Sequence, residues 1–165
     1  GLAIYYLKRM EKQSELKLSL PTIKDIGWIF GGFVLTIIWN MLGSTLLPLT
    51  QNQSTLNEVL ATNSVVTALT NIYLVLIAPL TEELVFRGVI MVACEDTKKY
   101  HLGLILSSIL FGFLHLIGYH FSFSDLLFYS ISGAILGVVR QSSGKLSNSI
   151  FLHMLINFIA TFVAP

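Results

Sequence analysis

The chain has 165 residues, of which 54% are apolar and 12% charged, with a formal net charge of +1. A soluble domain carries about a quarter charged residues, and a domain of this size cannot bury long charge-free helices on every side. The composition therefore excludes a soluble globular domain and indicates an integral membrane protein, in agreement with the mean hydropathy of +0.75.

Long stretches of the chain carry no Asp, Glu, Lys or Arg: 26–57, 59–81, 100–124 and 146–165. A helix of about 20 apolar residues spans a bilayer, so several of these stretches are long enough to do so. A transmembrane β-barrel would need alternating segments of about 10 residues, which the sequence lacks. We therefore predict an all-α fold, a polytopic integral membrane helical bundle forming a single domain over 1–165.

The predicted elements follow in chain order. They are a helix remnant at 2–7, a polar and basic connector at 8–25, and membrane segments at 26–49, 64–95, 102–118, 123–140 and 146–164, with a polar loop at 50–63. Proline bends a helix and removes a backbone donor, so the third segment should be kinked or split at Pro79. The bundle then has about five full transmembrane segments plus the remnant. Because the chain begins with Gly1, we expect it to be the C-terminal part of a longer protein.

The basic residues predict the orientation in the membrane. Nine of the ten Lys and Arg fall in the connectors 8–25, 96–101 and 140–145, all on one side of the predicted bundle. The opposite loops, 50–63 and 119–122, have none. The positive-inside rule then makes the three basic connectors cytoplasmic, and we expect the plasma membrane of a bacterium. The tenth basic residue, Arg87, lies inside a span.

Two carboxylates accompany Arg87 in the apolar run 79–88, namely Glu82 and Glu83. Ionisable groups at membrane depth are costly, and by default they mark a function or a paired structural element. Glu83 and Arg87 are separated by one helical turn and can pair. Glu82 points about 100° away and is free to face another group. A purely structural ion pair between helices remains the alternative interpretation.

Further polar residues lie inside the later segments: His115 in the fourth, and His153 with Asn157 one turn apart in the sixth. Glu83 precedes Lys99 by 16 residues and His115 follows it by 16. Two helices leaving the same connector would therefore place both groups at similar depth, about 24 Å along the helix. The sequence predicts that these side chains converge within the membrane.

Such a set of residues suits amide hydrolysis. A desolvated carboxylate can act as general base toward water, a neighbouring histidine can share the proton, and an Asn amide or His N–H can stabilise an oxyanion. A second interpretation makes Glu82, His115 and His153 three ligands of a catalytic Zn²⁺, with water in the fourth position. The chain has no HExxH motif, so such a metal would be held across three helices.

Three ordered motifs, Glu82-Glu83-x-x-x-Arg87, Phe111-x-x-x-His115 and His153-x-x-x-Asn157, resemble those of the CPBP family over 79–158. This family comprises the CAAX prenyl protease and bacteriocin-processing (Abi) intramembrane proteins, often classed as metalloproteases. The resemblance implies that Glu82 and His115 activate water, that His153 and Asn157 hold the oxyanion, and that Glu83 and Arg87 order the site. The chain departs from the family upstream, where fewer helices are present.

The predicted function is an intramembrane endopeptidase that cleaves a membrane-associated peptide or protein, in CAAX-type or bacteriocin leader-type processing. Membrane lipid and the peptide substrate are its expected partners, and no nucleic acid is expected. Two alternatives remain open: a non-enzymatic bacteriocin self-immunity or membrane regulatory protein on the same scaffold, and a proton-coupled transporter fragment. Loss of cleavage on replacing Glu82 or His115 would distinguish the enzyme from both.

Two remaining residue types have structural interpretations. Gly112, Gly133 and Gly137 are expected to allow close helix packing, the last two as a small-xxx-small pair. Tyr129 is expected in an interfacial aromatic belt, where its hydroxyl reaches water.

Overall fold

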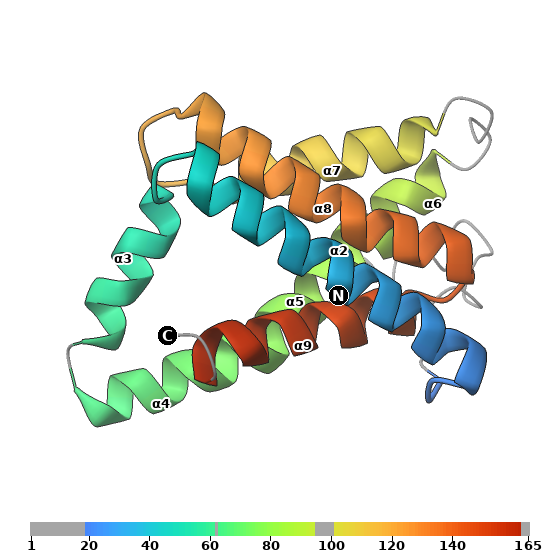
Figure 1. Ribbon diagram of the computed structural model, residues 1–165, viewed down its shortest axis with the longest axis horizontal. Helices are drawn as coiled ribbons and strands as arrows, with labels where there is room; N and C mark the ends of the chain where they lie inside the picture. The colour runs from blue at the N-terminus through green and yellow to red at the C-terminus, as the bar shows by residue number, and fades with distance from the viewer. Residues whose placement is uncertain (1–18, 62, 95–100, 163–165) are drawn as a thin grey trace.

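The computed structural model describes residues 19–61, 63–94 and 101–162, and within these ranges the fold is all-helical, as predicted (Figure 1). The helices are α2 (Ile23–Leu46), α3 (Gln51–Leu60), α4 (Ser64–Ile72), α5 (Ala78–Glu83), α6 (Met91–Ala93), α7 (Leu102–Leu114), α8 (Phe123–Ser143) and α9 (Leu146–Phe162), with π-helical segments η2 (Tyr73–Ile77) and η3 (Leu84–Ile90). The predicted remnant at 2–7 and most of the connectors 8–25 and 96–101 lie outside the described residues.

Three helices in the described part of the chain are long and apolar enough to cross a membrane: Ile23–Leu46, Ser64–Ala93 and Phe123–Ser143. Two further apolar helices, Leu102–Leu114 and Leu146–Phe162, are shorter. All five occupy the positions of the predicted segments. Large apolar side chains on the outer surface of the bundle are exposed, such as Phe30 at 65%, which suits contact with lipid rather than water.

The prediction of a loop at 50–63 is wrong, because α3 occupies most of it. Thr50 caps this helix by accepting a hydrogen bond from the backbone N–H of Gln53 at 3.2 Å. Asn63 then caps α4 by accepting from Val65 and Val66 at 3.1 and 3.0 Å. Both caps satisfy backbone donors that would otherwise be unpaired. None of the residues of α3 is buried, so the helix has no apolar face. The hydrophobic pattern of the sequence therefore did not predict it.

Pro79 does not split the third segment, which is helical from Ser64 to Ala93. The π-helical segment η2 precedes the proline, and the N–H of Ala78 bonds to the carbonyl of Tyr73, five residues back. This wider turn brings the proline into the helix at the first turn of α5, where a missing N–H is best tolerated. A π-helical insertion therefore replaces the predicted break.

The helices meet around α8, which contacts α2, α7 and α9. The buried core consists of Phe86, Phe111, Leu136, Val139 and Leu152. A Cβ at Gly133 would lie 3.1 Å from Phe111 and 3.3 Å from Arg87 Nη2. A Cβ at Gly112 would meet the backbone carbonyl of Leu126 at 2.9 Å. The expectation that these glycines allow close packing is confirmed.

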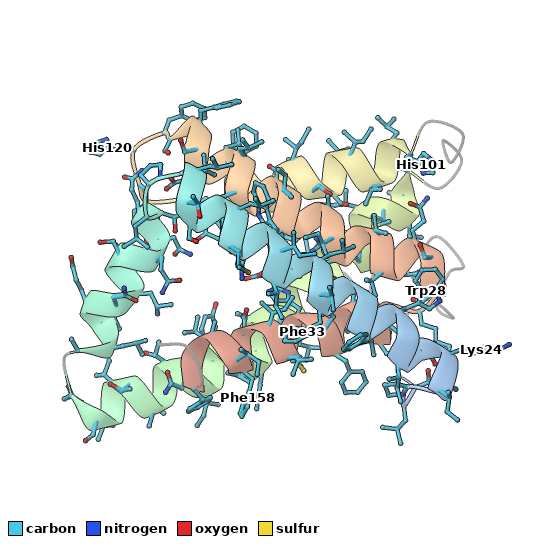
Figure 2. The ribbon with its side chains drawn as sticks, in the orientation of Figure 1. Lys24, Trp28, Phe33, His101, His120 and Phe158 are labelled. Carbon is cyan, nitrogen blue, oxygen red and sulfur yellow. The ribbon has the colours of Figure 1, made fainter. Side chains whose placement is uncertain are left out.

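The described residues of the predicted basic connectors and of the opposite loop lie at opposite ends of the bundle, as the predicted topology requires. Lys24 and His101 lie toward one end and His120 toward the other (Figure 2). Asp25 of α2 joins the start of α9 at the first end by accepting hydrogen bonds from Lys145 Nζ at 2.7 Å and Asn148 Nδ2 at 2.8 Å. At the opposite end, Gln51 Nε2 donates to the carbonyl of His120 at 2.9 Å. That the end carrying the basic connectors faces the cytoplasm stays a prediction.

Candidate active site

The two glutamates lie at the end of α5, a single α-helical stretch between η2 and η3. Wider π-helical turns rotate the residues that follow them and occur often at functional sites. Glu83 is completely buried, whereas the side chain of Glu82 is 18% exposed. The two neighbours therefore occupy different environments, and Glu82 is the carboxylate that another molecule can approach.

Glu83 pairs with Arg87, as predicted. Arg87 Nη1 donates to Glu83 Oε1 at 2.7 Å, and both side chains are fully buried. Arg87 Nη2 donates to the carbonyl of Gly133 on α8, and its guanidinium lies 4.7 Å from the centre of the Phe111 ring. A buried charge is stable only when it is paired and hydrogen-bonded. The pair therefore fixes the long helix against α7 and α8.

The same oxygen of Glu83 also orients His153 of α9. His153 Nδ1 lies 3.2 Å from Glu83 Oε1, and because a carboxylate only accepts, the histidine donates. The other ring nitrogen, Nε2, then faces Glu82 Oε2 at 3.9 Å, beyond hydrogen-bond distance. A carboxylate that holds one histidine nitrogen fixes which nitrogen is available for chemistry. Here the available nitrogen faces the accessible glutamate.

His115 follows the last residue of α7, and its ring contacts two aromatic rings, those of Phe111 and Tyr129. Its Nδ1 donates to the carbonyl of Phe111 at 2.9 Å, which leaves Nε2 as the nitrogen with the free lone pair in the neutral ring. Phe111 contacts the rings of both His115 and His153, at centroid distances of 4.7 and 5.8 Å. No direct hydrogen bond joins His115 to Glu82. The two histidines, which the sequence predicted to converge, are therefore linked by their shared contact with Phe111.

Asn157 has a contact that the sequence did not suggest: its Nδ2 donates to the carbonyl of Leu74 at 2.8 Å. Leu74 lies in η2, where the N–H of Ala78 bonds to Tyr73 instead, and the next residue, Pro79, has no N–H. The carbonyl of Leu74 thus lacks a donor from its own helix, and Asn157 supplies one. One amide hydrogen of Asn157 is thereby used to dock α9, and the second remains for other partners.

The zinc set of Glu82, His115 and His153 stays a prediction. In the part of the chain that the structure describes, no group of three His, Cys, Asp or Glu side chains is placed to hold a metal ion. The Nδ1 atoms of the two histidines are engaged by the Phe111 carbonyl and by Glu83, and both Nε2 atoms remain available.

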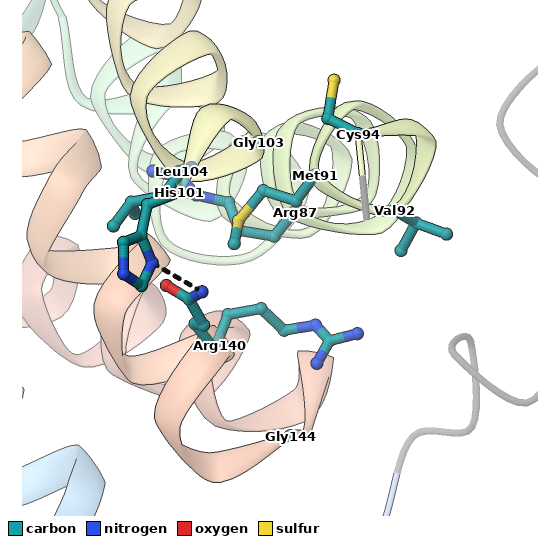
Figure 3. A pocket seen from close by; sticks show the side chains of 10 residues that line it. Arg87, Met91, Val92, Cys94, His101, Gly103, Leu104, Arg140 and Gly144 are labelled. Carbon is teal, nitrogen blue, oxygen red and sulfur yellow. Dashed lines mark hydrogen bonds between the residues drawn. The ribbon is translucent and has the colours of Figure 1, made fainter. Parts of the chain in front are cut away.

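A cavity of about 200 Å³ borders the site at the basic end of the bundle (Figure 3). Arg87, Cys94, His101 and Arg140 contribute to its wall. His101 Nδ1 accepts a hydrogen bond from Gln141 Nε2 at 3.1 Å, which joins the start of α7 to the end of α8. Arg87 therefore pairs with Glu83 and also lines this cavity.

Sequence reasoning missed two aromatic residues of the site. Phe111 was part of a motif, and its spacing of four residues before His115 could have indicated a contact between the two rings. Tyr129 was assigned to an interfacial belt, yet its ring stacks on His115 at a centroid distance of 4.1 Å. No spacing rule could have found this contact, because Tyr129 lies on a different helix.

Comparison with known proteins identifies a family. A sequence model of the type II CAAX prenyl endopeptidase Rce1-like family matches residues 64–159, more than half of the chain. This range contains every residue of the cluster described above. No curated protein and no solved structure gives a match. The chain therefore belongs to the Rce1-like family of type II CAAX prenyl endopeptidases.

Proposed function

We propose that this protein is an intramembrane endopeptidase that hydrolyses a peptide bond of a membrane-associated peptide or protein, using a water molecule activated by Glu82 and His115. Membership of a family of CAAX prenyl endopeptidases supports proteolysis. The apolar helices support a lipid environment and, with it, a substrate that reaches the site from the membrane.

Glu82 is suited to the role of general base because its carboxylate is partly exposed and accepts no hydrogen bond from Arg87. In the proposed reaction, the water oxygen attacks the carbonyl carbon of the substrate while its proton passes to Glu82. The C–N bond then breaks, and the proton moves to the leaving nitrogen. The lone pair on His115 Nε2 accepts a hydrogen bond from the same water and orients it.

His153 and Asn157 are proposed to stabilise the oxyanion of the tetrahedral intermediate. His153 contributes through Nε2 when that nitrogen carries a proton, and Asn157 through the amide hydrogen that Leu74 does not use. Donors fixed before the reaction are the most effective, since they need no reorganisation. Glu83 and Arg87 provide this rigidity without contacting the substrate.

The observation that carries the proposal is that Glu83 Oε1 accepts two hydrogen bonds. One buried oxygen accepts from Arg87 at 2.7 Å and from His153 at 3.2 Å, and this directs His153 Nε2 toward Glu82. A purely structural ion pair would not need to orient a histidine toward a second, partly exposed carboxylate.

A cleavage assay in liposomes tests the proposal. The substrate is a synthetic, lipid-anchored CAAX peptide carrying a fluorophore and a quencher on either side of the expected cleavage position. Glu82→Gln should lower kcat by at least about 100-fold, the lower range for loss of a general base. The matched control is Glu58→Gln on α3, where the carboxylate is exposed and remote from the cluster. Equal rates for wild type and Glu82→Gln would refute the assigned role.

A further inference from the structure

The ring of His115 contacts two aromatic rings, and only one of them belongs to its own helix. Phe111, one turn earlier on α7, contacts one part of the ring at a centroid distance of 4.7 Å and an interplanar angle of 44°. Tyr129 of α8 stacks on it at 4.1 Å and 15°, a nearly parallel arrangement. Aromatic contacts of this kind restrict rotation of a ring as well as burying it.

The hydroxyl of Tyr129 is itself fixed at the start of α3. It shares a hydrogen bond with the hydroxyl of Thr50 at 2.9 Å and accepts one from Asn52 Nδ2 at 3.3 Å. The same segment is tied to α8 a second time, because the backbone N–H of Gln51 donates to Asp125 Oδ2 at 2.9 Å. Tyr129 therefore connects His115 to a polar helix outside the apolar core.

The contacts of His115 make its orientation dependent on Tyr129. The Nδ1 hydrogen bond to the Phe111 carbonyl selects the nitrogen that carries the proton, but one hydrogen bond still permits the ring to tilt about it. A parallel ring 4.1 Å away removes that freedom. Misplacement of a catalytic group by about 1 Å can lower a rate by about 100-fold.

We propose that Tyr129 is a positioning residue for His115: its ring holds the imidazole with Nε2 available, and its hydroxyl anchors this arrangement to Thr50 and Asn52 at the start of α3. The role in catalysis rests on the proposed function, whereas the role in orientation rests on the geometry alone. The stack joins α7 to α8 one helical turn before Gly133, whose carbonyl accepts a hydrogen bond from Arg87.

Two substitutions separate the ring from the hydroxyl. Tyr129→Phe keeps the stack and loses the hydrogen bonds, so kcat should fall by about threefold, the effect of one modest hydrogen bond. Tyr129→Leu loses the stack, so kcat should fall by at least about tenfold while KM changes by less than about twofold. The matched control is Tyr119→Leu, because Tyr119 reaches Asn52 at 3.5 Å and makes no ring contact with His115; its kcat should stay within about twofold of wild type.

A second measurement does not depend on activity. The ring protons of His115, assigned by comparison with His115→Gln, should show an upfield NMR shift from the stacked tyrosine that Tyr129→Phe retains and Tyr129→Leu abolishes. Unchanged His115 resonances in Tyr129→Leu would overturn the proposal, as would unchanged kcat in an active enzyme. If wild type cleaves no peptide, the proposed function fails, and the resonances alone still decide whether Tyr129 stacks on His115.

Discussion

The buried pair of Glu83 and Arg87 gives the sharpest quantitative prediction. At an N···O distance of 2.7 Å and an effective dielectric constant of about 20, the attraction between the two charges is about 6 kcal/mol. Removing both charges from water costs several kcal/mol for each ion, so the intact pair contributes little net stability. Removing one partner is different, because it leaves an uncompensated buried charge.

Arg87→Met should therefore lower the free energy of unfolding by about 3–5 kcal/mol. Glu83→Gln should lower it by a similar amount, because it leaves the guanidinium of Arg87 without its carboxylate. The double variant Glu83→Gln/Arg87→Met removes both charges and should be no less stable than either single variant, so the two single effects are far from additive.

The cycle is measured by SDS titration in mixed micelles, followed by the fluorescence of the two tryptophans. If Glu83 and Arg87 anchor the site, each single substitution should strongly lower the free energy of unfolding, and the two changes should be strongly non-additive. Single effects below about 1 kcal/mol that add without coupling are the behaviour of an exposed surface pair. That result would refute the assignment of Glu83 and Arg87 as the buried anchor of the site.

Two further predictions concern helix docking and use the same titration. Asn157→Leu should cost about 1–3 kcal/mol because the carbonyl of Leu74 loses its only described donor from outside its helix, and an unchanged free energy would contradict the role assigned to the amide. Gly133→Ala should destabilise by about 1–3 kcal/mol because the new methyl group lies 3.1 Å from Phe111, whereas Gly31→Ala, with no atom within 4 Å, should be neutral or slightly stabilising. Equal effects at the two glycines would show that close packing at Gly133 is unimportant.

The sequence predicted the helical fold and its main segments because membrane helices depend on local properties, namely length, apolar content and the placement of Lys and Arg. It also predicted the pairing of Glu83 with Arg87, since a spacing of four residues brings two side chains to the same face of a helix. The error at α3 has the opposite cause. A polar helix that buries no residue has no apolar periodicity, and its start depends on a single cap at Thr50.

The contacts between helices were not accessible from the sequence in the same way. The stacking of Tyr129 on His115 and the docking of Asn157 on Leu74 depend on helix rotation, which no spacing within a helix determines. The second contact also depends on η2, because only the π-helical turn before Pro79 leaves the carbonyl of Leu74 without its usual donor. The sequence thus indicated which residues form the site, whereas the structure shows how each is held.

The central claim is that water activated at Glu82 attacks the peptide bond. Mass spectrometry of the products formed in ¹⁸O-labelled water, by wild type, Glu82→Gln and the control Glu58→Gln, tests it most directly. Wild type and the control should give one ¹⁸O atom in the new C-terminal carboxylate, and Glu82→Gln should give at least about 100-fold less product. Labelled product from Glu82→Gln at the wild-type rate would contradict the claim, and so would unlabelled product from wild type.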